Sequence, residues 1–355
     1  MALATACGDD DSTNPCNNDG VCDADETTGN CPNDCPICVE DGTCDSAAGE
    51  NGINCPADCG GVTCDLSESG DDYDFLASQI FLPDDQQTST EIGMDLDGDG
   101  LVDNKLGVVI ATLAETSPDY DVNAEIAAAM AAGEILIVLR QRVDQFGDDD
   151  AVVLQVLKGV IHDASPIFDG NDELELDPSA STNEYLCGSL TGDELRAGPD
   201  AIHMPFPLPG MGALTFHLQQ VQVLGETTET GWTSVLLGGG VPAAEIDTVL
   251  YPALLGWMNK IIQEDPNGSL AQGVTDLLDG TCDSSIPGCE NTVPGEGECD
   301  ATADPPVITE TEIRCSQIML QALAPDVDLD NDGTNDAISV GMRIVAAVPV
   351  TIVTP

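Results

Sequence analysis

The chain has 355 residues, in which 65 Asp and Glu stand against 8 Lys and Arg, giving a formal net charge of −57. Such a surface repels polyanions and has no basic stripe from which counterions could be released, which excludes nucleic acid as a partner. Hydrophobic residues make up 42%, enough to bury a core in at least one domain. Aromatic residues make up only 3%, which argues against stacking platforms for sugars or bases.

The N-terminus has a run of small residues, MALATA, followed by Cys7 and then by a glycine and three aspartates. This pattern resembles the end of a bacterial lipoprotein signal peptide, which implies that Cys7 is lipidated. Residues 1–15 are then a signal remnant and an acidic tether. The alternative is an ordinary N-terminal cysteine. No apolar run reaches the roughly 18 to 20 residues that a spanning helix needs, so we expect membrane contact only through the lipid anchor.

Residues 16–63 contain two copies of the pattern C-x2-D-G-x-C…C-P-x-D-C, from Cys16 to Cys35 and from Cys38 to Cys59. Each copy is too short to bury a core, so we expect two disulfides per copy. The copies resemble spacer modules of bacterial surface and secreted proteins. Polar residues that stand at equivalent positions of the two copies either bind Ca²⁺ or only keep the loops soluble. They are Asp19, Asp23, Glu26, Asn30 and Asp34, matched by Asp41, Asp45, Glu50, Asn54 and Asp58.

Two segments, Asp95–Asp103 and Asp328–Asp336, share the motif D-x-D-x-D-G-x-x-D. It resembles the calcium loop of EF-hands, dockerins, thrombospondin type 3 repeats and integrin-type propellers. In such loops carboxylates at positions 1, 3 and 5 surround one ion, glycine at position 6 permits the turn, position 7 offers a carbonyl and position 9 another oxygen. The predicted Ca²⁺ ligands are Asp95, Asp97, Asp99, Leu101 and Asp103, with Asp328, Asp330, Asp332, Thr334 and Asp336.

Both loops depart from the EF-hand at position 12, where a bidentate glutamate is expected. This position holds Leu106 in the first loop and Ser339 in the second. We therefore expect structural calcium sites rather than regulatory EF-hands; the alternative is an acidic surface turn without metal. A weaker third candidate is Asp169–Glu173 with Asp177, which lacks glycine at the sixth place.

Residues 64–355 read as an α+β body with an antiparallel β-sheet or sandwich, preceded by the small disulfide-rich, loop-dominated module. Apolar periodicity predicts helices at 104–115 and 122–132, then a hairpin of strands at 135–143 and 152–161. Strands follow at 213–224, with a bulge near Gln219 and Gln220, and at 232–237. A helix kinked at Pro252 spans 243–262. The capping box Thr309/Glu312 starts a last helix that ends at 324–325, and a strand spans 337–353.

The chain has 15 cysteines, interleaved with Asp and Asn rather than with His at zinc-ligand spacing, which indicates an oxidising compartment. With Cys7 set aside, the other fourteen can all pair. The body holds five, an odd number, so we expect Cys64 to bridge into it, to Cys315 or Cys187. The predicted disulfide cysteines are Cys16, Cys22, Cys31, Cys35, Cys38, Cys44, Cys55, Cys59, Cys64, Cys187, Cys282, Cys289, Cys299 and Cys315.

The sequence has few catalytic patterns, since it contains neither the G-x-S-x-G motif nor the H-E-x-x-H motif. The three histidines lie in different segments: His162 beside Asp163 is at most a triad fragment, and His217 lies on the polar phase of its strand with His203 elsewhere. We name no catalytic residue.

The whole chain resembles bacterial surface lipoproteins with such repeats, a resemblance that implies no activity. We expect a calcium-binding protein, extracellular or on the outer cell surface, secreted or lipid-anchored, with a structural or adhesive role. Its partners would be calcium and a cell-surface or extracellular molecule. The alternative is a secreted hydrolase whose catalytic site lies outside known motifs.

Overall fold

The computed structural model describes residues 70–97, 100–116, 121–208, 210–299, 305–329 and 334–354. The chain divides into two compact units, and the second, residues 62–97 and 101–355, contains every element described below. The lipidation at Cys7, the repeats of residues 16–63 and the cysteine at 64 lie outside the described residues, so what was inferred for them stays a prediction.

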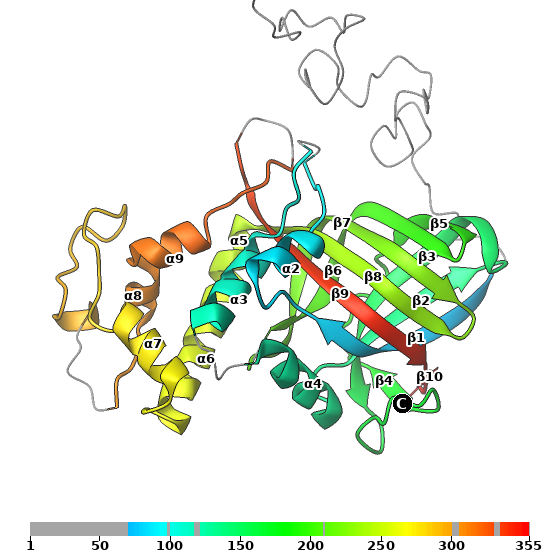
Figure 1. The fold of residues 1–355 in the computed structure, drawn as a ribbon, viewed down its shortest axis with the longest axis horizontal. Helices are drawn as coiled ribbons and strands as arrows, with labels where there is room; N and C mark the ends of the chain where they lie inside the picture. The colour runs from blue at the N-terminus through cyan, green and yellow to red at the C-terminus, as the bar shows by residue number, and fades with distance from the viewer. Residues whose placement is uncertain are drawn as a thin grey trace, which may run out of the picture. The chain divides into compact units, whose positions relative to one another are not determined.

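The fold is α+β, with a ten-stranded sheet in the order β10-β4-β3-β2-β1-β9-β8-β7-β6-β5 (Figure 1). All neighbours are antiparallel except β10 and β4. The strands are β1 (Asp71–Phe81), β2 (Ile137–Val143), β3 (Gly147–Ile161), β4 (Glu173–Leu176), β5 (Leu186–Gly192), β6 (Glu194–Leu208), β7 (Gly212–Thr228), β8 (Gly231–Pro242), β9 (Ala337–Pro349) and β10 (Thr351–Ile352).

The sheet closes on itself, because β5 at its edge also pairs with β3. Val153 of β3 lies opposite Arg142 of β2 and opposite Cys187 of β5, so the strands other than β4 and β10 form a ring. Side chains alternate between the two faces of each strand. The inward set forms the main core, with Phe75, Phe206 and Trp232 at most 1% exposed.

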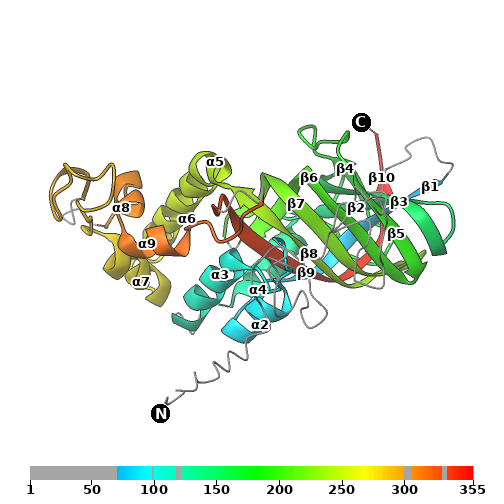
Figure 2. The same cartoon turned by 90° about the horizontal axis from the view of Figure 1, so that it is seen from above.

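Helices pack beside this ring (Figures 1 and 2). They are α2 (Gln86–Glu91), α3 (Lys105–Thr116), α4 (Val122–Ala132), α5 (Ala243–Glu245), a π-helical turn (Ile246–Leu250), α6 (Tyr251–Glu264), α7 (Ser269–Leu278), α8 (Glu310–Arg314) and α9 (Gln317–Ala322). Helix α3 contacts β9 and α4 contacts β1, while α6 contacts both α7 and α8. None of the helices described is long and apolar enough to cross a membrane.

Several predicted elements are confirmed. The helices at 104–115 and 122–132 are α3 and α4, and Asp121 caps α4 by accepting hydrogen bonds from the N–H groups of Asn123 and Ala124. The strands at 135–143 and 152–161 are β2 and β3. The bulge of β7 falls where expected, since Gln220 has a φ of 50° and the register shifts between Gln219 and Gln222.

Two boundaries were wrong. The helix predicted from Thr309 has its capping box, but it breaks after Arg314, and the side chain of Ser316 caps a separate helix, α9. The strand predicted over 337–353 ends at Pro349, and its continuation β10 leaves the ring to pair with β4. The helix predicted over 243–262 is confirmed as the helical run of α5, the π-helical turn and α6, in which Pro252 stands in the first turn of α6.

Two disulfides staple the segment between α7 and α9. Cys282 bonds to Cys299 and Cys289 bonds to Cys315, and these sulfurs surround the buried Ile286. Cys315 is therefore not the partner of Cys64, and that alternative was wrong. Cys187 is also disulfide-bonded.

Candidate metal centre

The first acidic motif folds into a closed loop whose carboxylates converge. Oxygen atoms of Asp95, Asp97 and Asp103 all lie within 4.8 Å of one another. The ends of the loop are joined by backbone hydrogen bonds between Met94 and Asp103, with N···O distances of 2.7 and 3.3 Å. At position 7 the side chain of Leu101 points outward and is 67% exposed. Asp99 lies outside the described residues.

Three carboxylates at this spacing repel one another. At an effective dielectric constant of about 20, two unit charges about 5 Å apart cost roughly 3 kcal/mol. A divalent cation held between the carboxylates would replace this repulsion by attraction, and hard carboxylate oxygens are the ligands that Ca²⁺ prefers. The loop is therefore suited to hold a cation.

The second motif repeats the framework of the first. In loop one the N–H of Leu96 donates to Oδ2 of Asp103 at 2.8 Å; in loop two the N–H of Leu329 donates to Oδ1 of Asp336 at 3.2 Å. The N–H of Asp336 also donates to the carbonyl of Val327, as that of Asp103 does to Met94. The carboxylate at position 9 thus holds the backbone of both loops. Asp328 and Thr334 belong to this loop, while Asp330 and Asp332 lie outside the described residues.

The two loops, far apart in the sequence, pack into one apolar cluster on the outer face of the ring. The cluster consists of Met94, Leu96, Val327, Leu329 and Ala337. Glycines of β8 leave room for it, since a Cβ at Gly238 would lie 3.3 Å from Sδ of Met94 and a Cβ at Gly240 only 2.5 Å from Cδ1 of Leu329. The apolar residues of each motif therefore fix the loops to the sheet while the carboxylates face away from the cluster's core.

A polar network centred on Ser339 joins the ends of the two loops. The hydroxyl of Ser339 donates to Oδ2 of Asp326 at 2.5 Å and accepts from the N–H of Lys105 at 2.7 Å, while the N–H of Ser339 donates to Oδ1 of Asp326 at 2.8 Å. Burial raises the pKa of Asp326, and the hydrogen bonds from Ser339 and the charge of Lys105 offset this only in part.

Neither position-12 residue points to an EF-hand. Leu106 is 5% exposed and belongs to the main core, and Ser339 is fully buried in the network just described. Position 12 of each motif thus fixes its loop to the body.

No protein-family model, curated protein or solved structure matches this chain. The functional argument therefore depends on its own residues and their geometry.

The weaker third motif, at 169–173, is a turn whose carboxylates bind backbone groups. Asp172 accepts from the N–H groups of Ile167 and Phe168 at 2.9 and 2.8 Å, and Asp169 accepts from the N–H of Asn171 at 2.9 Å. These bonds account for two of its aspartates without a metal.

The histidines contact carboxylates on the surface. Nδ1 of His162 lies 2.7 Å from Oε1 of Glu175, and this hydrogen bond raises the pKa of His162. Its Nε2 lies 3.7 Å from Asp163, whose side chain is 87% exposed. His203 and His217, which come from separate segments of the sequence, lie side by side on β6 and β7.

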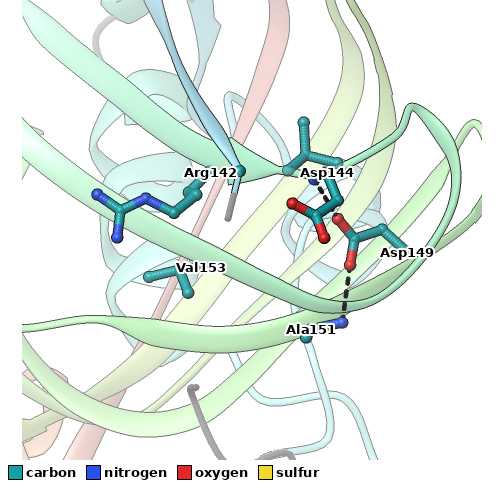
Figure 3. A pocket seen from close by; sticks show the side chains of 7 residues that line it. Arg142, Asp144, Asp149, Ala151 and Val153 are labelled. Carbon is teal, nitrogen blue, oxygen red and sulfur yellow. Dashed lines mark hydrogen bonds between the residues drawn. The ribbon is translucent and has the colours of Figure 1, made fainter. Parts of the chain in front are cut away.

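A small pocket lies where β2 turns into β3 (Figure 3). Its volume is about 10 Å³, room for about one water molecule. The carboxylate of Asp149 accepts from the N–H of Asp144 at 2.7 Å and from that of Ala151 at 2.9 Å. The carboxylate thus holds the turn together, and the pocket is too small for an organic substrate.

Proposed function

We propose that this chain is a calcium-binding protein of the extracellular space or outer cell surface, with a structural or adhesive role. The observation that carries the proposal is the convergence of the Asp95, Asp97 and Asp103 carboxylates within 4.8 Å. The matching framework of loop two supports a second site of the same kind. Sites of this class in extracellular modules bind Ca²⁺ at roughly 0.1 to 1 mM.

A structural role follows from where the loops stand. Loop one leads directly into α3 and loop two directly into β9, and their apolar residues share one cluster on β8. An ion that binds only the folded loops stabilises the whole body by mass action. Calcium would thus hold together segments from both ends of the described chain.

The compartment is inferred from the disulfides. Bonds at Cys282–Cys299 and Cys289–Cys315 form and persist in oxidising surroundings, and extracellular fluids also supply millimolar calcium. Lipidation at Cys7 would anchor the protein, and an adhesive partner would be a cell-surface or extracellular molecule. Among the described residues the histidines show no nucleophile for the alternative hydrolase, because the side-chain contacts of His162 are with Glu175 and Asp163 and those of His203 are with Glu184 and His217.

The test is thermal unfolding of the full chain with millimolar Ca²⁺ or with EDTA. Because a net charge of −57 is screened by any cation, each sample is compared with one in NaCl of the same ionic strength. We expect Ca²⁺ to raise the melting temperature beyond the salt effect. The double variant Asp95→Asn/Asp328→Asn should lose this gain.

The matched control is Glu264→Gln/Asp276→Asn, which removes two charges from exposed positions of α6 and α7 and should keep the gain. A melting temperature that chelation leaves unchanged would overturn the proposal, as would an equal gain in the loop variant and the control.

A further inference from the structure

Two of the three histidines of the chain form a pair on adjacent strands. His203 of β6 lies directly opposite His217 of β7 in the antiparallel register, and their rings stack with centroids 4.5 Å apart and planes inclined by 27°. Figures 1 and 2 show β6 and β7 running side by side along the ring. Sequence separation hides this pair, which depends on the register of two long strands.

The pair faces solvent. Met204 and Phe216, the chain neighbours of the two histidines, are at most 1% exposed and belong to the core, so the alternation of the strands turns His203 and His217 outward. The side chain of His203 is 46% exposed. An ion or small ligand from solution can therefore reach the rings.

A glutamate orients one of the rings. Nδ1 of His203 lies 2.8 Å from Oε1 of Glu184, and the backbone N–H of His203 donates to Oε2 of the same carboxylate at 2.5 Å. A carboxylate accepts a hydrogen bond from Nδ1–H, so the lone pair of the neutral ring is on Nε2.

Glu184 is itself held in place. The side chain of Gln155, which is 6% exposed, donates from Nε2 to the carbonyl oxygens of Thr182 and Glu184 at 2.9 and 3.3 Å. The buried amide of Gln155 thus holds the backbone at Thr182 and Glu184, the carboxylate of Glu184 contacts His203, and the ring of His217 stacks on that of His203. A carboxylate that orients a ligating histidine is the usual outer shell of histidine metal sites.

We propose that His203 and His217 bind one late first-row transition-metal ion, such as Cu²⁺ or Zn²⁺, with Glu184 as the positioning residue for His203. Two nitrogens about 2.0 to 2.1 Å from one tetrahedral ion lie roughly 3.4 Å apart. Residues directly opposite on antiparallel strands have Cβ atoms about 5 Å apart, so the site requires only that the His217 ring rotate while Glu184 holds the His203 ring. Water completes the coordination.

This site differs in chemistry from the aspartate loops. Imidazole nitrogen suits Cu²⁺ and Zn²⁺, whereas Ca²⁺ takes oxygen ligands, so Ca²⁺ does not compete for the histidine pair. The strongly negative charge of the chain raises the local concentration of either cation. The inference does not depend on calcium binding, and either proposal can fail without the other.

The chain contains a matched control in its third histidine. His162 is paired through Nδ1 with Glu175 at 2.7 Å, which reproduces the imidazole–carboxylate contact of His203, but its other ion-pair partner is Asp163 rather than a second imidazole. Replacing His162 removes one histidine and leaves the His203–His217 pair intact.

The test is a titration of the full chain with Cu²⁺ in the presence of excess Ca²⁺, which competes for the many carboxylates of the chain whether or not the acidic loops bind it tightly. Electron paramagnetic resonance reports how many imidazole nitrogens bind the copper. We expect one equivalent with two-nitrogen coupling in the wild type and in His162→Ala. The signal should fall to one nitrogen in His203→Ala and in His217→Ala, with unchanged circular dichroism. Glu184→Gln should weaken Zn²⁺ binding about tenfold in competition with a chelating dye.

Copper bound without two-nitrogen coupling in the wild type would overturn the proposal. So would a two-nitrogen signal that persists in His203→Ala or disappears in His162→Ala. If Glu184→Gln leaves the Zn²⁺ affinity unchanged, the positioning role of Glu184 is wrong.

Discussion

Replacing Ser339 by alanine should cost more than the loss of one hydroxyl suggests. The hydroxyl of Ser339 donates to the half-buried carboxylate of Asp326 and accepts from the N–H of Lys105. A hydrogen bond to a charged group contributes about 1.5 to 3 kcal/mol, and a donor left without its acceptor costs about 1 to 3 kcal/mol. The two bonds share one atom and are not additive, so we expect Ser339→Ala to lower the free energy of unfolding by about 2 to 4 kcal/mol.

The loss should depend on pH. The pKa of Asp326 is raised above its ordinary value of 3.8 by burial. The folded state thus holds this proton more tightly than the unfolded chain does. The stability gained from protonation is fully present below pH 3.8, the ordinary pKa, and is lost as pH rises through the raised pKa of the folded state. Removing a hydroxyl that stabilises the carboxylate raises that pKa further. The penalty of Ser339→Ala should therefore grow as pH rises through this window and then level off.

The assay is guanidinium unfolding at several pH values, with calcium held constant because a ligand of the folded state changes the apparent stability. Ser179→Ala is the matched control, since the N–H and hydroxyl of Ser179 both donate to Asp177, at 2.8 and 2.6 Å, in an exposed turn. We expect this control to cost about 0.5 kcal/mol. Equal losses in the two variants, or a Ser339→Ala penalty that falls as pH rises, would refute the reasoning.

Two further predictions concern packing and charge. Gly341→Ala should destabilise the fold by about 1 to 3 kcal/mol, because its Cβ would lie 2.6 Å from a backbone carbonyl oxygen. Gly256→Ala, in an open position of α6, should stabilise it by about 0.5 to 1 kcal/mol. Thermal unfolding checks both, and an unchanged stability of Gly341→Ala would contradict the close packing at this glycine. Arg140→Gln breaks a pair of hydrogen bonds with Asp74, whose side chain is 16% exposed, and should lower the free energy of unfolding by about 1 to 2 kcal/mol. Arg142→Gln, in a more exposed pair, should lower it by under about 1 kcal/mol. Equal losses of stability in denaturant titrations would count against burial as the cause.

The two acidic loops show what local sequence can predict. Ligand spacing within nine residues decides which carboxylates converge, and Asp95, Asp97 and Asp103 do so. That the two loops pack against each other could not be predicted. Their shared cluster on β8 depends on the space above Gly238 and Gly240, and the sequence does not show which side chain packs over a glycine in a strand.

The histidine pair was missed because β6 was missed. Proline at 199, 205 and 207 removes backbone donors and makes the segment unlike a strand, and the Gly198–Pro199 peptide bond is cis. Without β6 its register with β7 cannot be assigned, and His203 has no visible relation to His217. Disulfide pairing likewise depends on the tertiary fold, so the bond between Cys289 and Cys315 could not be deduced from the cysteine count.

The order of strands in the ring has a consequence for how the chain is made. Strand β9 lies between β1 and β8, so Phe75 pairs with Pro349 across nearly the whole body. The ring therefore stays open until residues 337–349 have been synthesised, and such non-local pairing is slow to form. In an exported chain, the ring would therefore close only after the C-terminal strand has emerged. The second acidic loop lies directly before β9 in the chain and leads into this closing strand.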